Sequence, residues 1–258
     1  MKHYWYTKYW LMSAKITRLS AVSVCVNYSE QLSKCIENKK HFDEWIIVTS
    51  KNDLKTIQLC KTNELKCITF ENIYKKSGMF DQSKRINKGL KTVGTDKWVL
   101  LIDPDIYLPN NFRELLGQLP LNNECIYTIN GQNREEIISP EEFDKKKRVF
   151  DEKKISVRPL FFQNLKNMNI KVFHSASEIK GPWYFAGFFQ LFCSKKGIKY
   201  TEKGNGLSFD DVKFVIDNFN IYQHRSLEMR VLHFGEAFKS WAGKADNLQK
   251  SAKTLFRG

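Results

Sequence analysis

The stretch that decides the fold is Trp98-Val99-Leu100-Leu101-Ile102-Asp103-Pro104-Asp105. An unbroken run of large apolar residues, ended by turn-forming residues, predicts a strand that is buried on both faces, as in a parallel sheet. Ligands of open α/β sheets bind at the carboxyl ends of strands. The sequence therefore predicts a functional site at Asp103 and Asp105.

Strands and helices alternate on the N-terminal side of this run. Strands are predicted at residues 21–26, 44–49 and 67–70, and helices at residues 28–40, 53–61 and 82–93, the last ended by Gly94. This alternation predicts an α/β fold, with a mostly parallel central sheet flanked by helices. The lack of any linker or repeat predicts a single domain over residues 1–258.

The composition indicates a globular protein with an affinity for polyanions. The 258 residues include 42 Lys and Arg against 28 Asp and Glu, a formal net charge of +14. Such a charge favours binding to nucleic acid, anionic lipid or phosphorylated substrates, although a basic surface that only aids solubility is the alternative. Hydrophobic residues make up 42% of the chain, which excludes a disordered protein.

The spacing of Asp103 and Asp105 indicates a metal site. Residues i and i+2 of an extended backbone point the same way, and Pro104 biases Asp103 toward an extended conformation. Two carboxylates suit Mg²⁺ or Mn²⁺, whose other positions go to water and diphosphate oxygens. The alternative is a turn that merely ends the strand, because Asp and Pro are common turn residues.

Two neighbouring motifs resemble those of the GT-A glycosyltransferases. They are Asn87-Lys88-Gly89-Leu90 and the strand ending in Asp103-Pro104-Asp105, with Pro109 following. That family places an Asn-x-Gly helix before a hydrophobic strand with an Asp-x-Asp (DxD) motif. The resemblance spans roughly residues 19–241 in the order of elements. It implies a nucleotide-diphospho-sugar transferase fold and a nucleotide-sugar donor, UDP-linked by default, with Mn²⁺ or Mg²⁺ as cofactor.

The resemblance also implies that the chain has two halves with different binding roles. Residues 19–130 would form the donor half and residues 131–258 the acceptor half. Asn27 and Thr49 would border the nucleotide base. The other donor-binding residues implied in this half, near the ribose, phosphates and metal, are Arg85, Asn87, Lys88 and Asp103.

Residues 231–241 (VLHFGEAFKSW) are similar to the closing motif of the retaining glycosyltransferases that include glycogenin. This similarity implies that His233 is a third metal ligand, that Lys239 contacts the diphosphate and that Trp241 lies nearby. The spacing of the Gly differs from that family, and Ser240 stands where a Pro is usual. A structural role for His233 is the alternative.

Asp210 and Asp211 precede a predicted helix at 212–219 and resemble the acidic pair of inverting GT-A enzymes. In those enzymes a carboxylate deprotonates the acceptor hydroxyl, which favours Asp211 as the base, with Asp210 beside it. Capping of the helix is the alternative. We favour inversion over the retention that the closing motif implies.

The aromatic stretch 183–192 supplies two candidate acceptor-binding residues, Trp183 as a stacking platform and Gln190 as its polar member. Packing in the core is the alternative for these aromatics. The basic run 145–148 is a candidate contact for phosphates, or only a solvated helix face.

Together these features predict a metal-dependent glycosyltransferase with a hydroxyl acceptor. Because of the positive charge, we favour 5-hydroxymethylated bases in phage DNA as the acceptor. The alternatives are a transferase for lipopolysaccharide or capsule at an anionic membrane surface, and a noncatalytic nucleic-acid-binding module with a degenerate GT-A fold. The scattered cysteines and the lack of a long apolar run predict a cytoplasmic location, in a bacterium or in the host of a phage.

Overall fold

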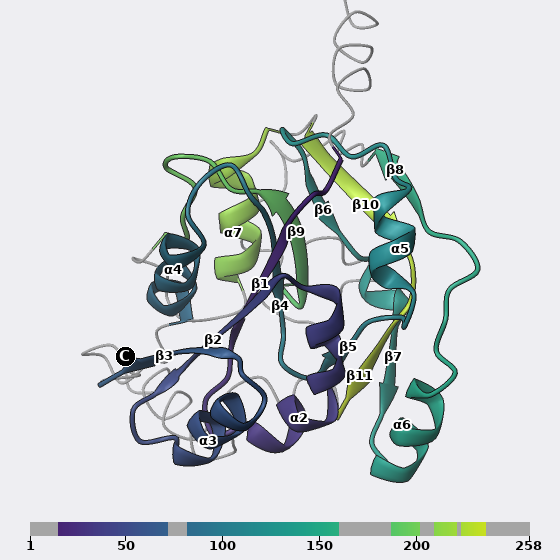
Figure 1. Cartoon of the computed structure of the whole chain (residues 1–258). Helices are drawn as coiled ribbons and strands as arrows, with labels where there is room; N and C mark the ends of the chain where they lie inside the picture. The colour runs from purple at the N-terminus through teal and green to yellow at the C-terminus, as the bar shows by residue number, and fades with distance from the viewer. Residues whose placement is uncertain (1–14, 72–81, 160–186, 202–208, 221–222, 236–258) are drawn as a thin grey trace, which may run out of the picture.

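The computed structural model describes residues 15–71, 82–159, 187–201, 209–220 and 223–235 (Figure 1). A sheet of eight strands lies at the centre, in the order β3-β2-β1-β4-β9-β6-β10-β8. These strands are β1 (Leu19–Val24), β2 (Glu44–Ser50), β3 (Lys66–Phe70), β4 (Trp98–Ile102), β6 (Ile126–Thr128), β8 (Ser156–Pro159), β9 (Phe189–Cys193) and β10 (His224–Glu228).

The predicted parallel strands are confirmed. β3, β2, β1 and β4 are joined by parallel pairings, so their carboxyl ends lie at one edge of the sheet. β9 runs antiparallel between β4 and β6, with Gln190 opposite Leu101 and Thr128. Every residue of β9 is buried, so packing explains this part of the aromatic stretch. The sheet is mostly parallel, as predicted.

A second sheet of three strands lies beside the first. It consists of β5 (Ile106–Tyr107), β11 (Val231–Phe234) and β7 (Arg134–Ile137), with β11 in the middle. The charged segment 135–158 has the composition of a surface helix and loop, but it also contributes residues to β7 and β8. Its helix α6 (Pro140–Lys147) begins as expected, since the Ser139 hydroxyl accepts a hydrogen bond from the Glu142 N–H at 3.2 Å.

The remaining helices are α2 (Ser29–Lys34), η1 (Ile36–His41), α3 (Leu54–Thr62), α4 (Gln82–Val93), α5 (Phe112–Gly117), η2 (Gly131–Asn133) and α7 (Phe209–Asn218). The single helix predicted at 28–40 is wrong, because the chain changes from an α-helix to a 3₁₀-helix at Cys35. Asn38 explains the change, since its amide donates to the Ile106 carbonyl at 2.7 Å and accepts from the Leu108 N–H at 3.0 Å.

Helices cover both faces of the large sheet (Figure 1). α4 and α7 pack on one face through a cluster that includes Val22, Ile86 and Phe214. α2, α3 and α5 contribute to a separate cluster with Leu32 and Phe112. No helix in the described segments is long and apolar enough to cross a membrane.

Candidate functional site

The Asp-Pro-Asp sequence forms a turn between β4 and β5. The Ile106 N–H donates to the Asp103 carbonyl at 3.2 Å, and Pro104 and Asp105 occupy the two central positions. The extended geometry predicted for Asp103 and Asp105 is therefore wrong, because the two residues lie in a turn. Their role as metal ligands stays a prediction. Pro104 suits this position because its ring fixes the φ angle that a turn needs there.

Asp105 lies at the meeting point of three segments. Its side chain is buried, and Oδ2 accepts a hydrogen bond from the Tyr28 hydroxyl at 3.0 Å. The His233 Nε2 lies 3.2 Å from the same oxygen, so the structure brings together two residues that the sequence assigned to the metal. The other oxygen, Oδ1, is buried and has no hydrogen-bond partner among the described residues.

Asp103 lies in an unfavourable electrostatic environment. Its N–H donates to the Phe188 carbonyl at 3.1 Å, which ties the turn to the residue before β9. Burial, with smaller effects from the charges of Asp105 and Asp211, raises the pKa of Asp103 well above its usual range. Arg134 opposes this rise, and its guanidinium carbon lies 5.3 Å from the centre of the Phe188 ring.

Asp211, the predicted base, lies in a buried polar cluster with Gln190 and Tyr200. The Tyr200 hydroxyl lies 3.0 Å from Asp211 Oδ1 and 2.8 Å from Gln190 Oε1. The carboxylate fills the space where a side chain at position 187 would be, since a Cβ on Gly187 would lie 2.0 Å from Asp211 Oδ2. The structure therefore brings together Asp211 and Gln190, which the sequence assigned to catalysis and acceptor binding.

Some predicted residues fall outside the described part of the chain. These are Trp183, Lys239 and Trp241, together with the side chain of Asp210, whose backbone lies at the start of α7.

Asn27 and Thr49 meet at the carboxyl ends of β1 and β2, through Asp53. One carboxylate oxygen of Asp53 accepts from the Asn27 N–H at 2.6 Å and from the Thr49 hydroxyl at 3.0 Å. Its other oxygen accepts from the Thr56 N–H at 3.2 Å and caps α3. Asn27 is exposed, with a φ of 53°, whereas Thr49 is fully buried.

The Asn-x-Gly motif has a packing role in this structure. The Asn87 amide donates to the Tyr200 carbonyl at 2.9 Å and accepts from the Tyr200 N–H at 2.7 Å. A Cβ on Gly89 would lie 2.4 Å from Val22 Cγ1, so only glycine allows α4 this close to β1. Lys88 is exposed, and Arg85 is buried with its guanidinium carbon 5.4 Å from the centre of the Phe70 ring.

Sequence reasoning missed Tyr28, Arg134 and Asp53. Tyr28 and Asp53 follow the ends of the first two strands, and this position is the signal by which they could have been found. Arg134 carried no signal, because in a chain with 42 Lys and Arg a single arginine does not stand out.

The carboxylates fit a divalent cation that is shared with a ligand. The described residues hold no group of three or more His, Cys, Asp or Glu side chains arranged for a metal. Mg²⁺ needs no such group, because it commonly binds one or two carboxylates and takes its other ligands from water and phosphates. Asp105 Oδ1, buried and without a described partner, is an oxygen available for this role.

Comparison with known proteins adds the fold family. No protein-family model matches this chain, and no curated protein matches its sequence. Glucosyl-3-phosphoglycerate synthase from Mycobacterium tuberculosis, in complex with phosphoglyceric acid, has a TM-score of 0.50 at 12% identity, over 93% of this chain and 80% of that one. Mannosyl-3-phosphoglycerate synthase from Rubrobacter xylanophilus has a TM-score of 0.50 at 13% identity, over 93% and 72% of the chains.

A further structure of the mycobacterial synthase, bound to Mn²⁺, UDP and glucosyl-3-phosphoglycerate, has a TM-score of 0.49 at 11% identity, over 92% and 80% of the chains. At this identity a likeness in structure shows the fold. The mostly parallel sheet, its flanking helices and the matches at a TM-score of 0.50 show that this chain has the GT-A nucleotide-diphospho-sugar transferase fold.

Proposed function

We propose that this chain is a metal-dependent glycosyltransferase that moves a sugar from a nucleotide-diphosphate donor to a hydroxyl acceptor. One observation carries the proposal: in a GT-A fold, the turn that follows β4 holds Asp103 and a buried Asp105, and the Asp105 Oδ2 lies 3.2 Å from His233 Nε2. A bound cation would favour the charged form of such carboxylates.

On the donor side, Asp103 and Asp105 would hold Mn²⁺ or Mg²⁺, with His233 as the third ligand. The cation would stabilise the charge on the departing diphosphate. Arg134 adds a positive charge beside Asp103. The exposed Asn27 after β1 would border the base, whereas the Thr49 hydroxyl donates its hydrogen bond to Asp53. UDP is the default nucleotide, and Arg85, Lys88, Lys239 and Trp241 complete the proposed donor site.

On the acceptor side, Asp211 is the proposed base. The acceptor oxygen bonds to the anomeric carbon, the bond from that carbon to the diphosphate oxygen breaks, and the acceptor proton passes to the carboxylate. Tyr200 and Gln190 hold the Asp211 segment, through the contacts to its carboxylate and carbonyl. Direct displacement of this kind inverts the configuration of the sugar.

For the acceptor, the proposal is a hydroxymethylated base in DNA. Its support is the net charge of +14, and not the basic run at 145–148. Lys146 in that run pairs with Glu135 and Glu142, and Lys147 pairs with Glu37 at 2.8 Å. These ion pairs already satisfy the two lysines locally, which favours the solvated helix face for this run.

The test is release of nucleoside diphosphate from a panel of sugar nucleotides, with and without Mn²⁺. Three acceptors are compared: DNA containing 5-hydroxymethylcytosine, 3-phosphoglycerate, and liposomes that carry a glycolipid acceptor with anionic lipid. Wild type is assayed beside Asp105→Ala, with Lys146→Met as a control for loss of a surface charge on α6.

The proposal expects release that needs both Mn²⁺ and Asp105 and that is unchanged in Lys146→Met. A rise with one acceptor names its class: modified DNA supports the proposed acceptor, whereas phosphoglycerate or glycolipid replaces it. Absence of release with every donor, together with salt-sensitive DNA binding, would instead support a noncatalytic binding module.

A further inference from the structure

The carboxylate of Asp105 is held through only one of its two oxygens by the described residues. Both of its described contacts, from the Tyr28 hydroxyl at 3.0 Å and the His233 Nε2 at 3.2 Å, fall on Oδ2. The torsion that turns a carboxylate about its Cβ–Cγ bond is otherwise soft. These two contacts therefore fix the direction in which Oδ1 points.

The residues that meet here come from three distant segments: Tyr28 before α2, Asp105 before β5, and His233 in β11. A small apolar cluster holds the same segments together, and it is separate from the two clusters on the large sheet. Its members, all buried, are Cys35, Tyr107, Ile137, Phe143, Phe150, Leu232 and Phe234. Tyr107 lies two residues after Asp105, and Leu232 and Phe234 flank His233, so this cluster supports the site directly.

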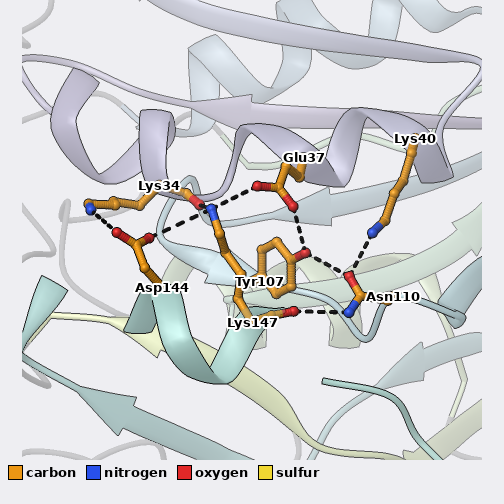
Figure 2. Close-up of polar contacts among 7 residues, drawn as sticks. All are labelled: Lys34, Glu37, Lys40, Tyr107, Asn110, Asp144 and Lys147. Carbon is orange, nitrogen blue, oxygen red and sulfur yellow. Dashed lines mark hydrogen bonds and ion pairs between the residues drawn. The ribbon is translucent and has the colours of Figure 1, made fainter. Parts of the chain in front are cut away.

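A polar network covers this cluster and joins α2 and η1 to α6 (Figure 2). Lys147 is its centre: the ammonium pairs with Glu37 at 2.8 Å and donates to the Lys34 carbonyl at 3.3 Å. Only 14% of its side chain is exposed. Lys34 in turn pairs with Asp144 of α6 at 2.7 Å.

The network also reaches the strand that follows Asp105. The Tyr107 hydroxyl lies 3.2 Å from Glu37 Oε2 and 2.8 Å from Asn110 Oδ1 (Figure 2). The Asn110 amide donates to the Lys147 carbonyl at 2.9 Å. Removal of Lys147 would leave Glu37 and the carbonyl at the end of α2 without this partner, and would loosen the segment that Tyr28 begins.

We propose that Tyr28 is a positioning residue for Asp105, and that the Lys147 network keeps Tyr28 in place. The inference rests on the proposed function in one respect, that Asp105 Oδ1 binds the cation. The hydroxyl of Tyr28 holds Oδ2, so that Oδ1 is already oriented before the cation arrives. Partners that orient a metal ligand in this way typically contribute tenfold or more to metal affinity.

The test is Mn²⁺ binding by the full chain in the presence of UDP, followed by the electron paramagnetic resonance signal of free Mn²⁺. Tyr28→Phe keeps the ring and removes the hydroxyl, and Lys147→Met keeps most of the length and removes the charge. Tyr127→Phe is the matched tyrosine control, because the Tyr127 hydroxyl contacts the Asn122 backbone and not the site. Lys146→Met is the matched lysine control, one residue away on α6.

We expect Tyr28→Phe to raise the Kd for Mn²⁺ by about tenfold, and Lys147→Met to raise it by a smaller factor. Both controls should stay within about twofold of wild type. Wild-type affinity in Tyr28→Phe would overturn the positioning role. Equal affinities of Lys147→Met and Lys146→Met would overturn the role of the network.

A second measurement separates this inference from the proposed function. If wild type does not bind Mn²⁺, or if Asp105→Asn binds it equally well, the proposed function fails. The contact itself is then decided by urea unfolding of Tyr28→Phe, Asp105→Asn and the double variant. Non-additive shifts of the unfolding midpoint support the positioning contact, and additive shifts overturn it.

Discussion

At the scale of single residues, Asp103 and Asp105 share a turn but differ in their surroundings. Asp105 has Tyr28 and His233 as neighbours on one oxygen. Asp103 is instead desolvated and lies near the like charges of other carboxylates. Both effects raise its pKa well above the usual range. A carboxyl in this position destabilises the folded protein at neutral pH, because folding must suppress the charge that the unfolded chain carries.

The first expected outcome follows from this environment. Asp103→Asn removes the charge while keeping the shape, so the metal-free protein should become more stable at pH 7. The direction of the pKa shift fixes the sign of the effect, which is a gain in the free energy of unfolding. Urea unfolding with chelator present measures this change in stability. A loss of stability would show that the charge of Asp103 does not destabilise the folded protein.

His41 should make stability depend on pH. Its ring is buried and packs edge-on to Phe112, with centroids 5.5 Å apart. Burial, with smaller effects from the charges of Lys40 and Arg113, lowers its pKa to about 4. The neutral ring is therefore favoured by folding, and its contribution to stability is complete above pH 6.5 and is lost as the pH falls toward 4.

His41→Leu should flatten this dependence. Between pH 7 and pH 4, the wild type should lose of the order of 3 kcal/mol more than the variant. Chemical unfolding at a series of pH values measures this difference in stability between the two proteins. Any pH dependence that His224 contributes cancels from the difference, because both proteins retain His224. Parallel curves for the two proteins would mean that His41 does not titrate in this range.

The candidate site residues that belong to local motifs could be named from the sequence. Asp103, Asp105, Gln190, Asp211 and His233 each lie next to a recognisable strand or helix boundary. Their partners could not be assigned in this way, because the contacts join residues far apart in the chain. Tyr28 and Asp105 are 77 positions apart, and only the completed sheet brings them together.

At the scale of elements, the close approach of α4 and β1 depends on Gly89. A Cβ at this position would lie 2.4 Å from Val22 Cγ1. Gly89→Ala should therefore lower the free energy of unfolding by about 1 to 3 kcal/mol, as overpacked cores do, despite the higher helix propensity of Ala.

The matched test combines Gly89→Ala with a smaller residue at the contact position on β1. Val22→Ala alone creates a small cavity, but combined with Gly89→Ala it should restore part of the stability that Gly89→Ala removes. Thermal and urea unfolding of the four proteins measure the coupling. Additive losses would show that the two positions do not compete for space.

The elements themselves were predicted where their pattern is local. The strands β1, β2, β3 and β4 have apolar, β-branched runs, and α4 has apolar residues at helical spacing and a glycine with a φ of 87° after it. Where tertiary contacts decide, prediction failed. Asn38 draws its segment toward β5, which breaks the expected helix.

At the scale of the whole molecule, the order of strands and helices predicted an α/β fold with a mostly parallel sheet. The resemblance of the Asn-x-Gly and Asp-x-Asp motifs to a known family then predicted the GT-A fold. The acceptor was not predictable in the same way, because no local motif encodes it and the net charge of +14 is a property of the surface as a whole. The basic run at 145–148 does not assign the charge to phosphate binding, since Lys146 and Lys147 are paired with acidic neighbours.

The measurement that tests the central claim most directly is Mn²⁺-dependent release of nucleoside diphosphate by wild type and Asp105→Asn, on the donor that wild type uses best. Folding of the variant is confirmed by circular dichroism and by its urea midpoint. We expect a folded variant whose rate falls by roughly a hundredfold or more, because a ligand of the cation that stabilises the leaving diphosphate is lost. An equal rate in a folded Asp105→Asn variant would contradict the claim that the carboxyl end of β4 is the catalytic site.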